Sequence, residues 1–150
     1  MELIKIYLDT SAVNSFLFGS EKEPKRFEKV QQIFDLLKQE KIRVAVSFYT
    51  LVEIYWFCMD NFPADIAGEM ARKAIYEILS YKIELIPMLR RAERLKLSPI
   101  ISMTDSSDLP HAMMAYVYEC DYLVAYDSHF EEIADIIKFL TPDALLHVLN

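Results

Sequence analysis

The chain has 150 residues, of which 53% are hydrophobic and 26% charged, a size and composition typical of one globular domain spanning residues 1–150. It holds only two glycines, so no glycine-rich phosphate loop can form, and this excludes P-loop NTPases and Rossmann dinucleotide enzymes. The net charge is −7, and residues 99–150 hold nine acidic side chains against one basic side chain, Lys138. A protein that binds nucleic acid through its net charge alone would be basic, so the role of these acidic residues must be judged from their positions.

The sequence carries no signal for secretion or membrane insertion. The N-terminal residues lack a basic segment followed by a long apolar run, and the uncharged runs fall far below the ~20 residues that span a bilayer. We expect Cys58 and Cys120 to be small buried side chains rather than a disulfide. The prediction is therefore a cytoplasmic protein that does not associate with membranes.

Strand and helix patterns alternate along the chain. Continuously apolar or alternating stretches predict strands at residues 3–8, 42–46, 83–86, 122–126 and 137–140. Three- and four-residue apolar spacing, with Pro and capping residues at the starts, predicts helices after residue 9 and at 24–37, 48–57, 64–80, 88–97, 108–119, 130–135 and 142–148. This order predicts an α/β fold, with a mostly parallel central sheet between two helical layers.

Four acidic residues are expected at one edge of that sheet. Asp9 and Asp127 directly follow predicted strands, and the carboxyl ends of parallel strands meet at the same edge. Glu53 lies in an otherwise apolar helix, and Asp108 begins another. Carboxylates gathered in one cleft repel unless a cation lies among them, and oxygen ligands suit Mg²⁺ or Mn²⁺. Since phosphate oxygens readily complete the coordination of such ions, the pattern favours phosphodiester hydrolysis.

Each of these acids also has an ordinary structural explanation. Asp9 and Asp108 can be helix caps, Asp127 a turn residue, and Glu53 a carboxylate paired with an Arg. Two neighbours are weaker candidates: Asp105 lies among capping residues, and His111 follows Asp108 at the helical spacing Asp-x-x-His. With three His and no closely spaced Cys pair, a structural zinc site is not expected.

Five stretches of the chain, taken in order, carry a family resemblance. They are residues 6–13 (IYLDTSAV), 47–54 (SFYTLVEI), 108–115 (DLPHAMMA), 122–130 (YLVAYDSHF) and 140–145 (LTPDAL). Their order and spacing resemble the PIN-domain ribonucleases, especially the VapC-like toxins of toxin–antitoxin pairs. One departure stands before the last aspartate, where VapC-like sequences usually carry a Thr and this chain has Ala125-Tyr126.

The resemblance implies a PIN-like fold and endonucleolytic cleavage of RNA by water that Mg²⁺ or Mn²⁺ activates. It implies that the catalytic, metal-binding acids are Asp9, Glu53, Asp108 and Asp127, with Thr10 or Ser11 as polar residues behind them. A small antitoxin protein is the implied partner. If RNA binds, we expect the basic stretches 22–43 and 90–96 to contact its phosphates.

Other functions remain open at this point. A phosphoaspartyl phosphatase would need a second Asp two residues after Asp9, where this chain has Ser11, and no acidic pair typical of a two-component receiver is present. The stronger alternative is a non-catalytic PIN-like module that binds RNA or a protein partner. The aromatic-rich stretch 48–62 predicts either an exposed patch that forms a homodimer or simply part of the core.

Overall fold

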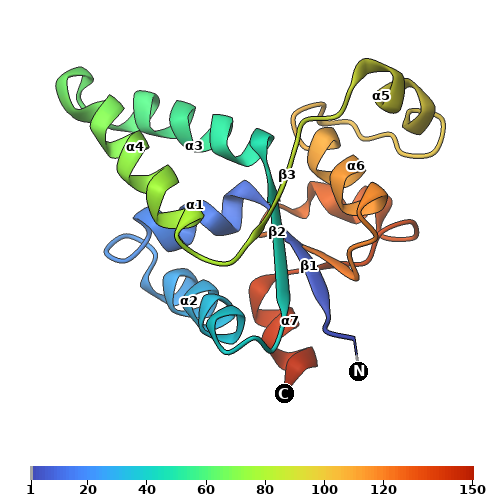
Figure 1. The fold of residues 1–150 in the computed structure, drawn as a ribbon, viewed down its shortest axis with the longest axis horizontal. Helices are drawn as coiled ribbons and strands as arrows, with labels where there is room; N and C mark the ends of the chain where they lie inside the picture. Colours follow the sequence, from blue (N-terminus) through green and yellow to red (C-terminus); the bar gives the residue numbers. More distant parts are fainter. Residues whose placement is uncertain (1) are drawn as a thin grey trace.

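The computed structural model describes residues 2–150 and contains one sheet of five parallel strands between helices on both faces (Figure 1). The strands are β1 (Lys5–Leu8), β2 (Arg43–Ser47), β3 (Glu84–Ile86), β4 (Tyr122–Val124) and β5 (Phe139–Leu140). Their order across the sheet is β3-β2-β1-β4-β5. This confirms the predicted α/β/α architecture, and every neighbouring pair of strands is parallel.

Helices connect the strands. They are α1 (Thr10–Phe18), α2 (Pro24–Lys38), α3 (Phe48–Asn61), α4 (Ala64–Leu79), α5 (Arg91–Leu97), α6 (Leu109–Val117), the 3₁₀ helix η1 (Ser128–Ile133) and α7 (Pro142–Leu149). The helices α3 and α4 form an antiparallel hairpin that extends from the rest of the domain (Figure 1). Across residues 2–150, no helix has the length and apolar character needed to cross a membrane.

The strand order reverses beside β1. Consecutive strands β1, β2 and β3 extend the sheet in one direction, whereas β4 and β5 extend it in the other. The ends of β1 and β4 lie in register, with Leu8 opposite Val124, and the Asp9 amide donates to the Val124 carbonyl at 2.9 Å. In open parallel sheets, ligand sites form outside the carboxyl ends of the strands at this kind of reversal.

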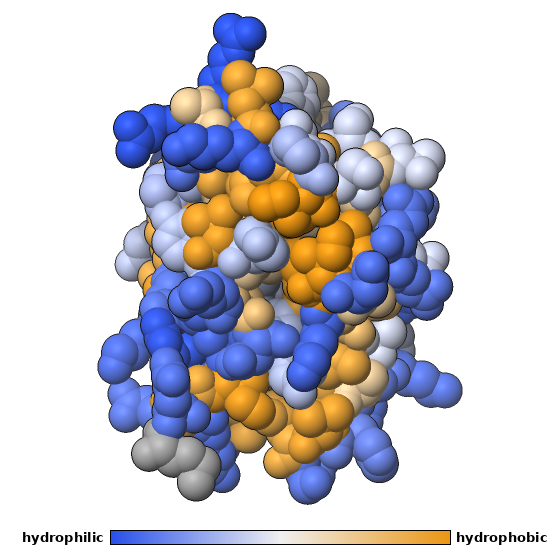
Figure 2. Space-filling model, turned by 90° about the vertical axis from the view of Figure 1, so that its right-hand side faces the viewer, coloured by the Kyte–Doolittle hydropathy of each residue, from blue (hydrophilic) through white to orange (hydrophobic). Residues whose placement is uncertain are grey.

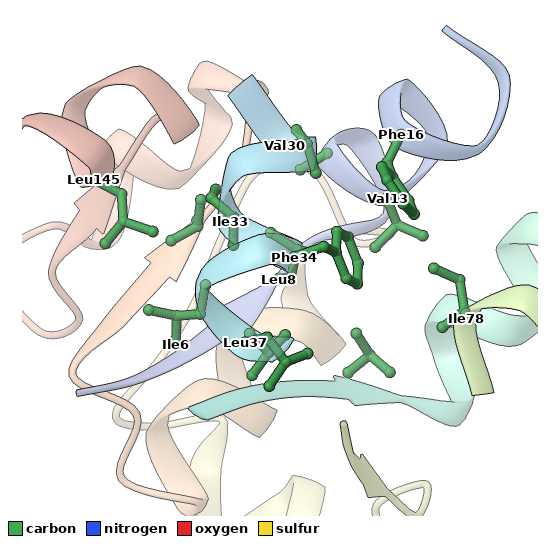
Figure 3. Close-up of a cluster of buried hydrophobic side chains, with 14 of the residues drawn as sticks. Ile6, Leu8, Val13, Phe16, Val30, Ile33, Phe34, Leu37, Ile78 and Leu145 are labelled. Carbon is green, nitrogen blue, oxygen red and sulfur yellow. The ribbon is translucent and has the colours of Figure 1, made fainter. Parts of the chain in front are cut away.

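Two buried clusters hold the helices against the sheet. On one face, the larger cluster joins the sheet to α1, α2, α4 and α7 (Figure 3), through residues that include Val13, Phe16, Val30, Ile33, Phe34, Leu37, Ile78 and Leu145. On the other face, the second cluster is built around Tyr7, Met113, Met114, Leu123 and Phe130. Both cysteines are free thiols; Cys58 is buried as predicted, and Cys120 is partly exposed.

Several element boundaries differ from the sequence predictions. The strand β4 ends at Val124 instead of residue 126, because its neighbour β5 has only two residues to pair with. Beyond this pairing, the Tyr126 amide donates to the Ser11 hydroxyl at 3.1 Å instead of to a strand. Helix α5 begins at Arg91 instead of residue 88, since the Glu93 carboxylate accepts the Arg90 amide at 3.0 Å and so fixes the helix start. The segment predicted as a helix at 130–135 is the 3₁₀ turn η1.

The face of the molecule that carries α5 and α6 exposes apolar groups among charged ones (Figure 2). Large apolar side chains of these segments that are exposed include Met88, Leu95, Ile100, Tyr116 and Val117. They lie outside both buried clusters and contribute little to the stability of the core.

Their different burial predicts that two aromatic residues contribute very differently to the free energy of unfolding. Phe34 is 1% exposed and stacks on Phe16 with ring centroids 4.2 Å apart, whereas Tyr76 on α4 is 77% exposed. We expect Phe34→Ala to lower the free energy of unfolding by about 3–5 kcal/mol, because it leaves a cavity. Tyr76→Ala should change that free energy by less than about 0.5 kcal/mol. Urea unfolding measures both, and equal losses would contradict the assignment of the core.

Candidate functional site

Asp9 lies at the end of β1 and caps α1. Its Oδ2 accepts hydrogen bonds from the Ser11 amide at 3.1 Å and the Ser11 hydroxyl at 2.7 Å. The predicted capping role is therefore present. The other carboxylate oxygen, Oδ1, lies 3.9 Å from Nε2 of His111, and the residue is only 4% exposed. One carboxylate thus caps a helix and still presents an oxygen to the site.

Glu53 reaches the same place from α3. Its Oε1 accepts a hydrogen bond from the Thr10 hydroxyl at 3.3 Å and also contacts Nε2 of His111. Among the described residues these are its hydrogen-bonding partners, so the alternative that an Arg pairs with Glu53 is wrong. The Glu53 side chain is 42% exposed, which leaves it accessible from solvent.

Three further carboxylates surround His129. Its Nδ1 lies 3.0 Å from Asp108 Oδ2, 3.1 Å from Asp127 Oδ1 and 3.2 Å from Asp105 Oδ2. Asp108 precedes α6 but makes no capping hydrogen bond through its side chain, so the predicted cap is absent. Asp127 does accept the His129 amide at 2.9 Å, which is the predicted turn role. Asp105 accepts from the Ser107 amide and hydroxyl, as its surroundings predicted, and still faces His129.

The carboxylates beside His111 and those around His129 influence one another's pKa values. Burial raises the pKa of Asp108 to about 6; the His129 hydrogen bond opposes this rise, while the charges of Asp127, Asp9 and Asp105 add to it. Burial also raises the pKa of Asp9, against the charge of His111 and the hydrogen bonds from Ser11, and the charge of Glu53 raises it further. Asp108 is therefore close enough to Asp9, Asp105 and Asp127 for their negative charges to act on it.

Thr10 and Ser11 lie directly behind the acids. The Thr10 hydroxyl donates to Glu53, and the Ser11 hydroxyl both donates to Asp9 and accepts the Tyr126 amide. Ser11 therefore ties the segment after β4 to the carboxylate after β1. In this way a hydroxyl is present beside Asp9 even though Ala125-Tyr126 replaces the Thr of VapC-like sequences.

The sequence makes His111 a weaker candidate than the acids and His129 a weaker one still, and it does not single out Tyr7. Both histidines nevertheless contact carboxylates of the site. The Asp-x-x-His spacing was a signal for His111, because residues three positions apart share a helix face. Nothing in the neighbouring sequence distinguishes Tyr7 from the other buried residues of β1. Its contact with His111 arises only when the chain folds.

The residues present fit a hard divalent cation. They offer carboxylate oxygens from five acids, and such ligands suit Mg²⁺ or Mn²⁺. One ligand atom from each of Asp105, Asp108 and His129 lies within 4.8 Å of the others, a spacing that can hold a metal ion. A bound cation would also offset the burial and the mutual repulsion that raise the pKa values of Asp9 and Asp108.

Solved structures with a similar fold include VapBC proteins and a VapC toxin. DNA-bound VapBC from Salmonella typhimurium is 18% identical, with 93% of this chain and 99% of that chain covered and a TM-score of 0.66. VapBC2 from Rickettsia felis, bound to a promoter DNA fragment, is 17% identical, with 92% and 98% covered and a TM-score of 0.65. The sarcin–ricin-loop-cleaving toxin VapC20 from Mycobacterium tuberculosis is 14% identical, with 85% and 93% covered and a TM-score of 0.62.

At these identities the structural likeness shows a shared fold. No curated protein sequence matches the chain with significance. The family model of the PIN domain matches residues 6–136, which include Asp9, Glu53, Asp108 and Asp127. The chain therefore belongs to the PIN domain family, as its motifs predicted.

Proposed function

We propose that this protein is a metal-dependent endoribonuclease that hydrolyses RNA phosphodiester bonds. The observation that carries the proposal is that Asp9 and Glu53 beside His111, and Asp108 and Asp127 beside His129, lie near the reversal in strand order. Burial, followed by the charges of neighbouring carboxylates, raises the pKa values of Asp9 and Asp108. Membership of the PIN domain family supports nuclease activity. We further propose that residues 1–150 form one nuclease domain that acts in the cytoplasm.

In this proposal the four acids hold Mg²⁺ or Mn²⁺. When bound, the ion supplies a Lewis acid for a phosphate oxygen and lowers the pKa of water so that it becomes a nucleophile. Ser11 keeps the Asp9 carboxylate oriented through its hydroxyl hydrogen bond of 2.7 Å, and the Thr10 hydroxyl donates a longer one, of 3.3 Å, to Glu53. Because the pKa of Asp108 is raised to about 6, its carboxyl group is ionised above that pH and becomes protonated below it.

Basic residues beside the site supply contacts for the RNA backbone. A surface cavity of about 390 Å³ is lined by three basic residues of α2, Lys25, Arg26 and Lys29, by two acidic residues, Glu28 and Asp143, and by Thr141 and Tyr126, the residue before Asp127. The Arg26 guanidinium lies over the Tyr126 ring, 4.2 Å from its centroid. Lysine and arginine side chains hold phosphates without sequence preference, which supports the predicted use of this basic stretch despite the acidic net charge.

A non-catalytic PIN-like module is the second candidate. Such a module would have no need to keep four mutually repelling carboxylates, so their presence favours the enzyme. We also propose that the protein is the toxin of a toxin–antitoxin pair with a small antitoxin partner. The support is that the solved structures sharing its fold include VapBC complexes.

The proposed oligomer is a homodimer formed through the outer face of α3. Phe48, Tyr55 and Trp56 are all exposed, and Trp56 is 58% exposed. Phe57 instead stacks on Phe18 with ring centroids 4.9 Å apart. The aromatic stretch therefore divides between the interior and the surface, and its exposed part is an apolar patch of the kind that forms interfaces.

Mn²⁺ should stabilise the folded protein. At a free concentration of about 100 times Kd, a ligand that binds only the folded state adds about 2.7 kcal/mol, seen as a rise in Tm. Asp9→Asn or Asp127→Asn should abolish most of this rise, whereas Asp60→Asn, an exposed residue on α3, should preserve it. The rise should shrink at pH 5, where protonated Asp108 resists the cation. An unchanged rise in both site variants would refute the shared site.

RNA cleavage should require Glu53. Glu53→Gln keeps the shape but removes one negative ligand, so the metal-free protein should fold at least as well while cleavage falls by orders of magnitude. Glu69→Gln on α4, which removes a carboxylate paired with Lys73, is the matched control and should cleave normally. The assay is cleavage of single-stranded RNA with Mg²⁺ or Mn²⁺ and with EDTA as the blank. Cleavage that persists in EDTA, or a fully active Glu53→Gln protein, would overturn the proposal.

The oligomer can be tested through the exposed tryptophan. Light scattering at micromolar concentration should give the mass of a dimer for the wild-type protein. Trp56→Lys should give a monomer because it places a charge in the apolar patch. Leu95→Lys, which changes an exposed apolar residue on α5, should leave the dimer intact. A monomeric wild-type protein, or a dimeric Trp56→Lys protein, would rule out this interface.

A further inference from the structure

His111 is a buried histidine with a partner at each ring nitrogen. It lies on α6, is 0% exposed and is flanked by apolar residues of that helix. Its Nδ1 lies 2.6 Å from the Tyr7 hydroxyl, which in turn lies 2.7 Å from the Ser47 hydroxyl. Its Nε2 contacts the Glu53 carboxylate. A chain of hydrogen bonds therefore runs from the interior of the sheet to the candidate metal site.

The direction of this chain follows from its ends. An ionised carboxylate only accepts hydrogen bonds, so His111 Nε2 donates to Glu53. In a neutral imidazole Nδ1 then accepts, and the Tyr7 hydroxyl donates to it. Burial raises the pKa of Tyr7, so its phenol keeps this proton. In an imidazolium Nδ1 would donate instead, and Tyr7 could turn its proton to Ser47.

Glu53 has few other restraints. Its side chain is 42% exposed, and its other hydrogen bond, from Thr10, is long at 3.3 Å. His111, in contrast, is fixed by close packing and by the Tyr7 hydroxyl. The same Nε2 lies 3.9 Å from Asp9 Oδ1, so the ring is adjacent to both carboxylates. A rigid donor of this kind restricts the orientations open to the Glu53 carboxylate.

We propose that His111 is a positioning residue: anchored by Tyr7 and Ser47, it holds the Glu53 carboxylate beside Asp9 in the orientation that binds the cation. The inference rests on the metal site of the proposed function. It assigns to His111 an action through Glu53 and no direct bond to the ion. Metal binding without RNA is therefore the appropriate measurement.

The test is a double-mutant cycle on Mn²⁺ affinity, followed by the electron paramagnetic resonance signal of free Mn²⁺. His111→Leu should weaken binding about 10- to 100-fold, the usual cost of losing a residue that orients a metal ligand. His111→Gln should retain most of the affinity, because its amide can still donate to Glu53. In a Glu53→Gln background, His111→Leu should cause no further loss.

Tyr7→Phe keeps the cycle informative if His111→Leu fails to fold. It removes the anchoring hydroxyl and leaves His111 in place, so it should weaken Mn²⁺ binding less than His111→Leu, and this loss too should vanish in the Glu53→Gln background. Losses that add fully in that background would overturn the proposal. A nitrogen coupling in the electron paramagnetic resonance of bound Mn²⁺ would also overturn it, if the coupling persists in His129→Gln and disappears in His111→Gln. That result would make His111 a direct ligand.

The outcomes separate this inference from the proposed nuclease activity. If the protein cleaves RNA with metal but the double-mutant cycle is additive, the positioning role of His111 is refuted and the nuclease function stands. A non-additive cycle in a protein that cleaves no RNA would support the role of His111 and refute the nuclease. A wild-type protein that binds no Mn²⁺ would contradict both.

Discussion

Repulsion among carboxylates at one edge of the sheet is the constraint on which the surrounding structure depends. Burial and neighbouring negative charges raise the pKa values of Asp9 and Asp108. The residues around them offset that cost: Ser11 donates to Asp9, and the two histidines lie against carboxylates. Such an arrangement is costly for a fold that needs only stability, whereas a bound cation of the kind proposed would offset the cost.

The alternation of strands and helices was visible in the sequence because strands covered on both faces are continuously apolar and helices carry a three- to four-residue period. The placement of Asp9 followed from the same pattern, since it comes directly after β1. Asp127 was predicted directly after a strand, yet two residues separate it from β4 because the neighbouring strand β5 is so short. The length of a strand depends on the strands that pair with it, so it cannot be predicted from the strand's own residues.

The contacts of His111, His129 and Tyr7 could not be predicted for a related reason. They join different segments of the chain: Tyr7 contacts His111 across 104 residues, His111 contacts Glu53 across 58, and His129 contacts Asp108 across 21. The sequence offers a helix cap and a metal ligand as alternative roles for Asp9, whereas in the structure one carboxylate oxygen of Asp9 caps the helix and the other faces the site. A local structural role is therefore compatible with a role in metal binding.

Anomalous X-ray scattering from crystals soaked in Mn²⁺ is the sharpest test of the shared metal site, because it locates the ion without relying on activity. We expect a manganese peak at the carboxyl edge of β1 and β4, within coordination distance of carboxylate oxygens that include Asp9 and Asp108. A peak confined to another part of the surface, or none at saturating Mn²⁺, would contradict the claim that these carboxylates form one metal site.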